Sequence, residues 1–168
     1  MEWDRLEDEF CSLARTLSVV GDRWTLIILR DCFRKVRRFD DFRERLGIAP
    51  HVLSARLKKL VAAGVLRRVV YDDRLNRHEY VLTDTGLDLH PVVMAMVRWG
   101  DRHMTDDRGR PVRYRHRACG ALFDPVTVCS VCHEPVAARD VTAEPASAGA
   151  PPPEAGPPRA PRPEASRP

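Results

Sequence analysis

Apolar residues between positions 39 and 63 recur at the three- and four-residue spacing of two short amphipathic helices. The apolar positions are Phe39, Phe42 and Leu46 in the first block, and Leu53, Leu57, Leu60 and Val61 in the second. Gly47 separates the blocks, Pro50 suits the first turn of the second helix, and Gly64 suits its end. Two helices with a short glycine-containing connection are typical of a helix-turn-helix, which places its second helix in the DNA major groove.

Strand-like sequence follows directly. In VLRRVVYDDRLNRHEYVLT, two runs rich in Val, Leu and Tyr flank a polar loop at Asp72–Arg77, which predicts a β-hairpin. A helix-turn-helix followed by a basic hairpin is a winged helix. We therefore predict a mainly α fold with a small β-wing, of the α+β class, that reads duplex DNA.

Two further helical patterns flank this region. Apolar residues on both sides of Gly21 predict a pair of helices that cover the core. After Thr83, a stripe of apolar residues follows one face of a helix that Pro91 either opens or kinks. Its interface candidates are Leu89, Val92, Val93, Met96 and Trp99. Ordinary core packing would explain the stripe, but so small a domain favours burial against a second subunit, and hence a homodimer.

The charge distribution supports a DNA-binding surface. Residues 30–80 carry 14 Lys and Arg against 7 Asp and Glu, residues 1–29 carry 3 against 6, and residues 81–168 carry 11 of each. The basic excess therefore coincides with the predicted helix-turn-helix and wing, as contact with phosphates requires. Solvation of helix faces is the alternative explanation.

The second helix of the motif offers residues for base and phosphate contacts. His51, Ser54 and Ala55 lie near its N-terminal end, away from the predicted core face, and are candidates for base edges or thymine methyl groups. Arg56 is a candidate for guanine or phosphate. Lys58 and Lys59 lie one turn further on, where phosphate contact or plain solvation is expected.

The wing supplies a second set of candidates. Arg74, Asn76 and Arg77 lie at the predicted tip, where a narrow minor groove attracts guanidinium groups. Asp72 and Asp73 argue against a loop that binds only phosphate.

A separate pattern of metal-ligating residues lies near the C-terminus. His116 and Cys119 form one pair at x2 spacing, and after nine residues Cys129 and Cys132 form another. Two such pairs can present four ligands to a tetrahedral structural zinc, which predicts a small zinc-ribbon-like lobe at residues 106–141. The alternatives are His133 as a ligand, or three thiols in a loosely packed segment.

The rest of the chain limits the function classes. Residues 142–168 hold 9 of the 14 prolines and no large apolar residue, so we predict that this segment is a disordered tail. The predicted order along the chain is therefore a DNA-binding and dimerisation domain at residues 1–105, the lobe at residues 106–141 and the tail. No nucleophile elbow or phosphate-binding loop indicates an enzyme, and no organic cofactor is expected. Without a signal peptide or an 18-residue apolar run, we expect a cytoplasmic protein with no membrane contact and with reduced thiols.

Several separated motifs together resemble the HxlR-type winged helix-turn-helix regulators. They are Cys11, VVGDRWTLIILRDC, RRFDDFRERLGI, LSARLKKLVAAGVL, RHEYVLTDTGLDLHPVV and RWGD. The resemblance implies a homodimer that regulates transcription by binding double-stranded DNA at a palindromic operator. The wing departs from the family pattern, because Leu75-Asn76 stands where a Pro usually precedes the Arg before Glu-Tyr.

The resemblance also implies an alternative function as a sensor. In some similar proteins a cysteine at the position of Cys11 senses oxidants or electrophiles through its thiolate. A small core residue would explain Cys11 equally well. The other alternative is a metal-responsive sensor that uses the C-terminal Cys/His residues as its input.

Overall fold

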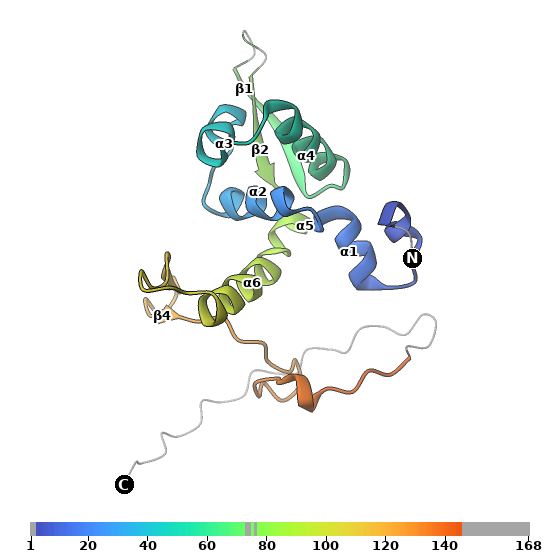
Figure 1. Ribbon diagram of the computed structural model, residues 1–168, viewed down its shortest axis with the longest axis vertical. Helices are drawn as coiled ribbons and strands as arrows, with labels where there is room; N and C mark the ends of the chain where they lie inside the picture. The colour runs from blue at the N-terminus through green and yellow to red at the C-terminus, as the bar shows by residue number, and fades with distance from the viewer. Residues whose placement is uncertain (1–2, 73–74, 76, 146–168) are drawn as a thin grey trace. The chain divides into compact units, whose positions relative to one another are not determined.

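The computed structural model describes residues 3–72, 75 and 77–145 of the chain, which forms two units, Met1–Gly109 and Arg110–Pro168. The first unit is helical apart from one hairpin (Figure 1). Its elements are η1 (Trp3–Asp8), α1 (Ser12–Val20), α2 (Arg23–Phe33), α3 (Phe39–Leu46), α4 (Pro50–Ala62), β1 (Leu66–Asp72), β2 (Arg77–Leu82), α5 (Asp84–Leu87) and α6 (His90–His103). The predicted winged helix-turn-helix is confirmed.

The helix-turn-helix follows from local sequence signals. Gly47 has a φ of 59° and ends α3 in the left-handed conformation, which glycine adopts without a Cβ clash. Pro50 occupies the first turn of α4, where its missing N–H has no helical partner to lose. Gly64, with a φ of 69°, follows the end of α4 and turns the chain into β1.

The core lies between α2, α3, α4 and β1. The apolar face predicted for α4 is buried, and its three leucines are inaccessible to solvent. They pack with residues from every neighbouring element, and the buried cluster consists of Val20, Ile28, Leu29, Cys32, Phe42, Ile48, Leu53, Leu57, Leu60, Val65 and Leu66. Burial of this set fixes the position of α4 relative to the rest of the unit.

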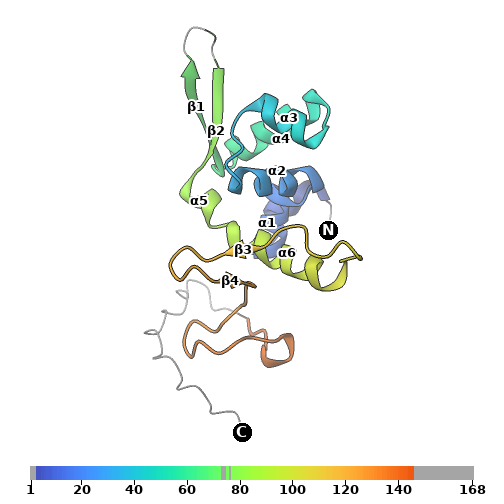
Figure 2. The ribbon, with the colours of Figure 1, turned by 90° about the vertical axis from the view of Figure 1, so that its left-hand side faces the viewer.

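The wing is an antiparallel pair in which Leu66 lies opposite Leu82. It projects beyond α3 and α4 (Figure 2). A register shift between Val70 and Asp72 places an extra residue in β1. The segment before α3 adds to the sheet, because the N–H of Tyr80 donates to the carbonyl oxygen of Arg37 at 2.8 Å.

A tight junction connects the wing to α6. The hydroxyl of Thr83 accepts from the N–H of Gly86 at 3.1 Å and donates to the carbonyl oxygen of Gly64 at 2.5 Å. A Cβ on Gly86 would lie 2.2 Å from the carbonyl oxygen of Val65, so this position requires glycine. Pro91 stands in the first turn of a separate helix, α6, and does not kink a longer one.

In its described residues, 110–145, the second unit contains short elements, β3 (Tyr114–Arg115), β4 (Leu122–Phe123) and η2 (Ala138–Asp140). None of residues 110–145 is buried. The tail predicted at 142–168 lies outside the described residues from position 146 onward. Within the described part of the chain, no helix is long and apolar enough to span a membrane.

Candidate nucleic-acid interface

The outer face of α4 carries the predicted contact residues. His51, Ser54, Ala55, Lys58 and Lys59 are all exposed, on the side of the helix opposite its buried leucines. The N-terminal half of this face offers an imidazole, a hydroxyl and a methyl group, and the next turn offers two ammonium groups. These groups match base edges and phosphates, respectively.

Arg56 differs from its neighbours because it is bound within the protein. Its Nε and a terminal nitrogen donate to the two carboxylate oxygens of Asp22 at 2.8 Å and 3.0 Å. The two side chains are 32% and 31% exposed, respectively. The structure therefore gives Arg56 an intramolecular partner, and it does not present a free guanidinium beside Ser54 and Ala55.

Asp22 serves two purposes at once. Its carboxylate caps α2 by accepting from the N–H groups of Trp24 at 3.0 Å and Thr25 at 3.3 Å. Burial raises the pKa of Asp22, but the hydrogen bond from Arg56, the N–H of Trp24 and the charge of Arg56 outweigh it and leave that pKa below its ordinary value. The ion pair thus connects the start of α2 to the middle of α4.

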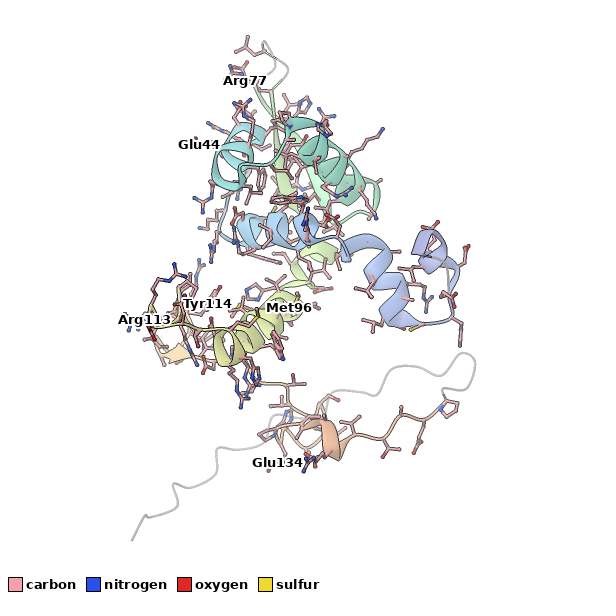
Figure 3. The ribbon with its side chains drawn as sticks, in the orientation of Figure 1. Glu44, Arg77, Met96, Arg113, Tyr114 and Glu134 are labelled. Carbon is pink, nitrogen blue, oxygen red and sulfur yellow. The ribbon has the colours of Figure 1, made fainter. Side chains whose placement is uncertain are left out.

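The wing presents basic side chains, some of which the sequence analysis did not select. Arg77 is exposed and lies at the outer end of the wing (Figure 3), whereas Arg74 and Asn76 lie outside the described residues. Arg67 and Arg68 are exposed on β1. Arg68 lies within hydrogen-bond distance of the Nδ1 atom of His78, at 3.0 Å. The adjacent pair Arg67 and Arg68 in the predicted strand is the sequence feature from which this extension of the basic surface could have been predicted.

Two arginines before α3 hold the base of the wing. Glu79 on β2 forms ion pairs with Arg38 at 3.2 Å and Arg37 at 3.9 Å. The guanidinium of Arg38 also lies 4.5 Å from the centre of the Tyr71 ring, within the range of a cation–π interaction. These contacts fix the direction in which the wing leaves the helices.

A buried carboxylate joins α2 to α3. Asp31 is fully buried, and Arg30 and Arg45 approach its two oxygens at 2.8 Å and 3.5 Å. The N–H of Val36 donates to the backbone oxygen of Asp31 at 3.0 Å, so the same residue also orders the turn after α2. Sequence reasoning missed this centre, because LRDCF reads as the apolar end of a helix.

The predicted apolar stripe on α6 divides into two parts. Val93 is only 9% exposed, and Leu89 is partly buried against the core, so both make contacts within their own chain. Val92, Met96 and Trp99 are 42%, 52% and 59% exposed. They share one face at four- and three-residue spacing, and Figure 3 labels Met96 on this helix.

The two cysteines of the first unit have opposite environments. Cys11 is exposed and immediately precedes α1, as its N-cap residue. Cys32 is buried, and burial together with the charge of Asp31 raises the pKa of its thiol to about 12. Cys32 is therefore a neutral core residue.

In the second unit, the structure forms each predicted ligand pair but does not bring the pairs together. The Nδ1 atom of His116 lies 3.3 Å from the sulfur of Cys119. Backbone N–H groups of Cys132 and Val131 hold the pKa of Cys129 below its ordinary value. Among the described residues, no three His, Cys, Asp or Glu side chains gather closely enough to hold a metal ion. The four predicted ligands thus do not form an assembled site in the structure.

Known proteins resemble this chain in sequence and in architecture. The HxlR-like helix-turn-helix family profile matches residues 19–108, more than half of the chain. An uncharacterized HTH-type transcriptional regulator of Mycobacterium tuberculosis, Rv3095, is 44% identical over 128 residues, which cover 76% of this chain and 80% of that protein. This match is longer than the first unit, so the similarity continues into the second.

Solved structures agree with the sequence comparison. PA1607, provisionally described as a transcription factor, superposes with a TM-score of 0.74 and 33% identity over 82% of this chain and 96% of that chain. The reduced form of the redox regulator HypR has a TM-score of 0.51 and 32% identity over 55% of this chain and 92% of that chain. The chain therefore belongs to the HxlR family of helix-turn-helix transcriptional regulators.

Proposed function

We propose that this DNA-binding regulator acts as a homodimer that places two α4 helices in successive major grooves of a palindromic operator. The exposed polar face of α4 beside a basic wing is the observation that carries the proposal. A two-fold dimer presents two equivalent recognition helices, so its half-sites lie about one turn of DNA, or a multiple of it, apart.

Within α4, we assign base reading to His51, Ser54 and Ala55. Lys58 and Lys59 contact phosphates and set the register of the helix in the groove. Arg56 acts differently, because its ion pair with Asp22 holds α4 against α2. It is therefore a positioning residue, and Arg77 with the arginines of β1 extends the phosphate contacts along the wing.

The exposed face of α6 supports the dimer. Val92, Met96 and Trp99 form an apolar surface on the outside of the first unit, where water contact is unfavourable. Packing this face against the same face of a second copy would remove all three side chains from water around a two-fold axis. The dimer also supplies the second recognition helix that a palindrome requires.

Footprinting the protein on its own genomic DNA tests the assignment directly. We expect protected sites with inverted symmetry and one dimer per site. The logarithm of affinity should fall linearly with the logarithm of salt concentration, because phosphate contacts release counterions. Protection by single subunits on asymmetric sites would contradict the dimeric assignment but would leave DNA binding intact.

A second candidate function is thiol-based regulation through Cys11. Its support is the exposure of that thiol at the start of α1, together with the similarity to HypR, which is a redox regulator. Attack of the Cys11 thiolate on hydrogen peroxide would form a sulfenic acid and release hydroxide, without any further reductant. Oxidation of Cys11 would alter the N-terminal end of α1, because Cys11 is the N-cap residue of that helix.

Operator affinity before and after peroxide treatment tests this second function. We expect treated protein to bind more weakly or more tightly, and a reducing thiol to restore the original affinity. Cys11→Ser should remove the response without changing the affinity of the untreated protein. A response that persists in Cys11→Ser would assign sensing to another cysteine.

A further inference from the structure

The second unit contains the same turn twice, at His116–Ala121 and at Cys129–Glu134. In both turns the N–H of the first residue donates to the carbonyl oxygen of the sixth residue at 2.9 Å. The carbonyl oxygen of the first residue accepts from the N–H of the fifth, at 2.8 Å and 2.9 Å respectively. The two segments share only the cysteine at position four, yet they adopt one hydrogen-bonding pattern.

The backbone conformation repeats as well. The fifth residue has a positive φ in both turns, 71° at Gly120 and 58° at His133. Residues other than glycine are uncommon in this left-handed conformation, and histidine is one of those that adopt it more often than most. In each turn the residue before it pairs antiparallel with the residue after it. These flanking pairs are Arg115 with Leu122 and Val128 with Pro135.

The metal-ligating side chains occupy equivalent positions in the two turns. Positions one and four hold His116 and Cys119 in the first turn, and Cys129 and Cys132 in the second. In the second turn the N–H of Val131 points to the Cys129 sulfur at 3.4 Å. Such N–H contacts stabilise a sulfur that carries negative charge, whether as thiolate or as metal ligand.

The described residues of the second unit also provide no buried core that would otherwise hold the two hairpins together. No side chain between residues 110 and 145 is buried, and each strand pair contains only two residues per strand or a single bridge. Units this small are ordinarily stabilised by a disulfide or a metal. The repeated turns and the missing core therefore point to the same kind of ligand.

We propose that the two turns close on one Zn²⁺ ion, bound by His116, Cys119, Cys129 and Cys132. Three thiolates and one neutral imidazole complete a tetrahedron, so the site is structural. Binding forms four metal–ligand bonds and releases three protons, one from each thiol. The metal supplies the connection between the two hairpins that side-chain packing does not supply.

Elemental analysis of the full chain, purified without added metal, is the first test. We expect about one zinc per chain. Replacing that zinc with Co²⁺ should give the visible absorption of tetrahedral cobalt with sulfur-to-metal charge transfer. Cys119→Ser and Cys129→Ser should each reduce zinc to below about one tenth per chain, because one site uses both turns. The helical circular dichroism of the first unit serves as the folding control.

Two matched variants sharpen the assignment. His133→Asn removes the neighbouring imidazole but keeps a residue that tolerates positive φ, and Cys11→Ser removes an exposed thiol from the other unit. Both should retain a full complement of zinc, whereas His116→Asn should lose it.

Three results would overturn the proposal. The first is unaltered protein that neither contains nor takes up zinc and in which the thiols of Cys119, Cys129 and Cys132 are freely alkylated. The second is full zinc binding by Cys119→Ser or by Cys129→Ser, which would show that the site does not need ligands from both turns. The third is loss of metal in His133→Asn with retention in His116→Asn, which would replace the proposed fourth ligand.

Discussion

The guanidinium of Arg56 in the middle of α4 donates two hydrogen bonds, of 2.8 Å and 3.0 Å, to the carboxylate of Asp22 at the start of α2. That carboxylate simultaneously caps α2 through two backbone N–H groups. The side chain of Asp22 therefore caps the N-terminal end of α2 and also anchors α4. The recognition helix is held by this polar contact at its flank as well as by its buried leucines.

The first prediction separates the two roles of Asp22. Asp22→Ala removes both cap and ion pair and should lower the free energy of unfolding by about 1–2 kcal/mol. Asp22→Asn keeps an acceptor for the cap and removes only the charge, so it should cost less than about 1 kcal/mol, allowing for the screening of a pair one-third exposed. Denaturant midpoints measure both. Equal losses would show that the ion pair carries the whole effect.

The pH dependence follows from the lowered pKa of Asp22. Because folding lowers this pKa, the carboxylate stabilises the native state at neutral pH, and the contribution is lost as pH falls through the folded pKa. The stability difference between the unaltered protein and Asp22→Asn should therefore shrink below about pH 5 and disappear in stronger acid. A difference that grows on acidification would contradict the lowered pKa.

The second prediction concerns the buried Asp31. Asp31→Ala would leave Arg30 and Arg45 without their carboxylate and should cost about 1.5–3 kcal/mol, the range for hydrogen bonds to a charged group, because the two arginine side chains left behind are 33% and 49% exposed and can be hydrated. Asp40→Ala is the matched control, because that carboxylate is 80% exposed and forms its ion pair within the same helix, with Arg43. It should cost less than about 0.5 kcal/mol. Thermal unfolding of both variants provides the measurement.

The sequence predicts the helical frame well because the relevant signals are local. The spacing of Leu53, Leu57 and Leu60, the left-handed Gly47 and the first-turn Pro50 each determine structure within a few residues. These same signals correctly separate the buried from the exposed face of α4. The position of the hairpin follows from its strand-like runs for the same reason.

Contacts between distant parts of the chain were not predictable in the same way. Arg56 lies 34 residues from Asp22, and nothing in the spacing of charges identifies that pair among other arginines. The division of the α6 stripe depends on which side α2 covers, so helical periodicity placed Val93 with Met96 although only Met96 faces outward. The His/Cys spacing predicted each pair in the second unit, but spacing alone does not bring the pairs together.

The third prediction distinguishes base readers from phosphate contacts. His51→Ala and Ser54→Ala should each weaken operator binding by about 1–3 kcal/mol and random DNA much less, if each contacts a base. Lys58→Ala should weaken both kinds of DNA equally and reduce the salt slope by about one unit. Titrations on operator and random duplexes at several salt concentrations make the comparison. Loss of the same size on both DNAs would remove His51 and Ser54 as base readers.

The fourth prediction concerns assembly through α6. Met96→Asp would place an unpaired carboxylate in the proposed apolar interface and should give monomers at micromolar concentration. Leu75→Asp makes a similar change at an exposed apolar residue of the wing. This variant should sediment with the same dimer mass as the unaltered protein. Analytical ultracentrifugation measures both. An unaltered chain that sediments as a monomer would exclude the dimer.

The fifth prediction concerns the two cysteines of the first unit. Cys11 is exposed, whereas burial and the charge of Asp31 raise the pKa of Cys32 to about 12, so at pH 8 that thiol is both inaccessible and neutral. Only the thiolate reacts with an alkylating agent. Iodoacetamide should therefore modify Cys11 in the native protein and leave Cys32 untouched until denaturant is added, as peptide mass mapping would show. Comparable rates at both positions in the native protein would mean that α2 opens from the core far more readily than its buried contacts indicate.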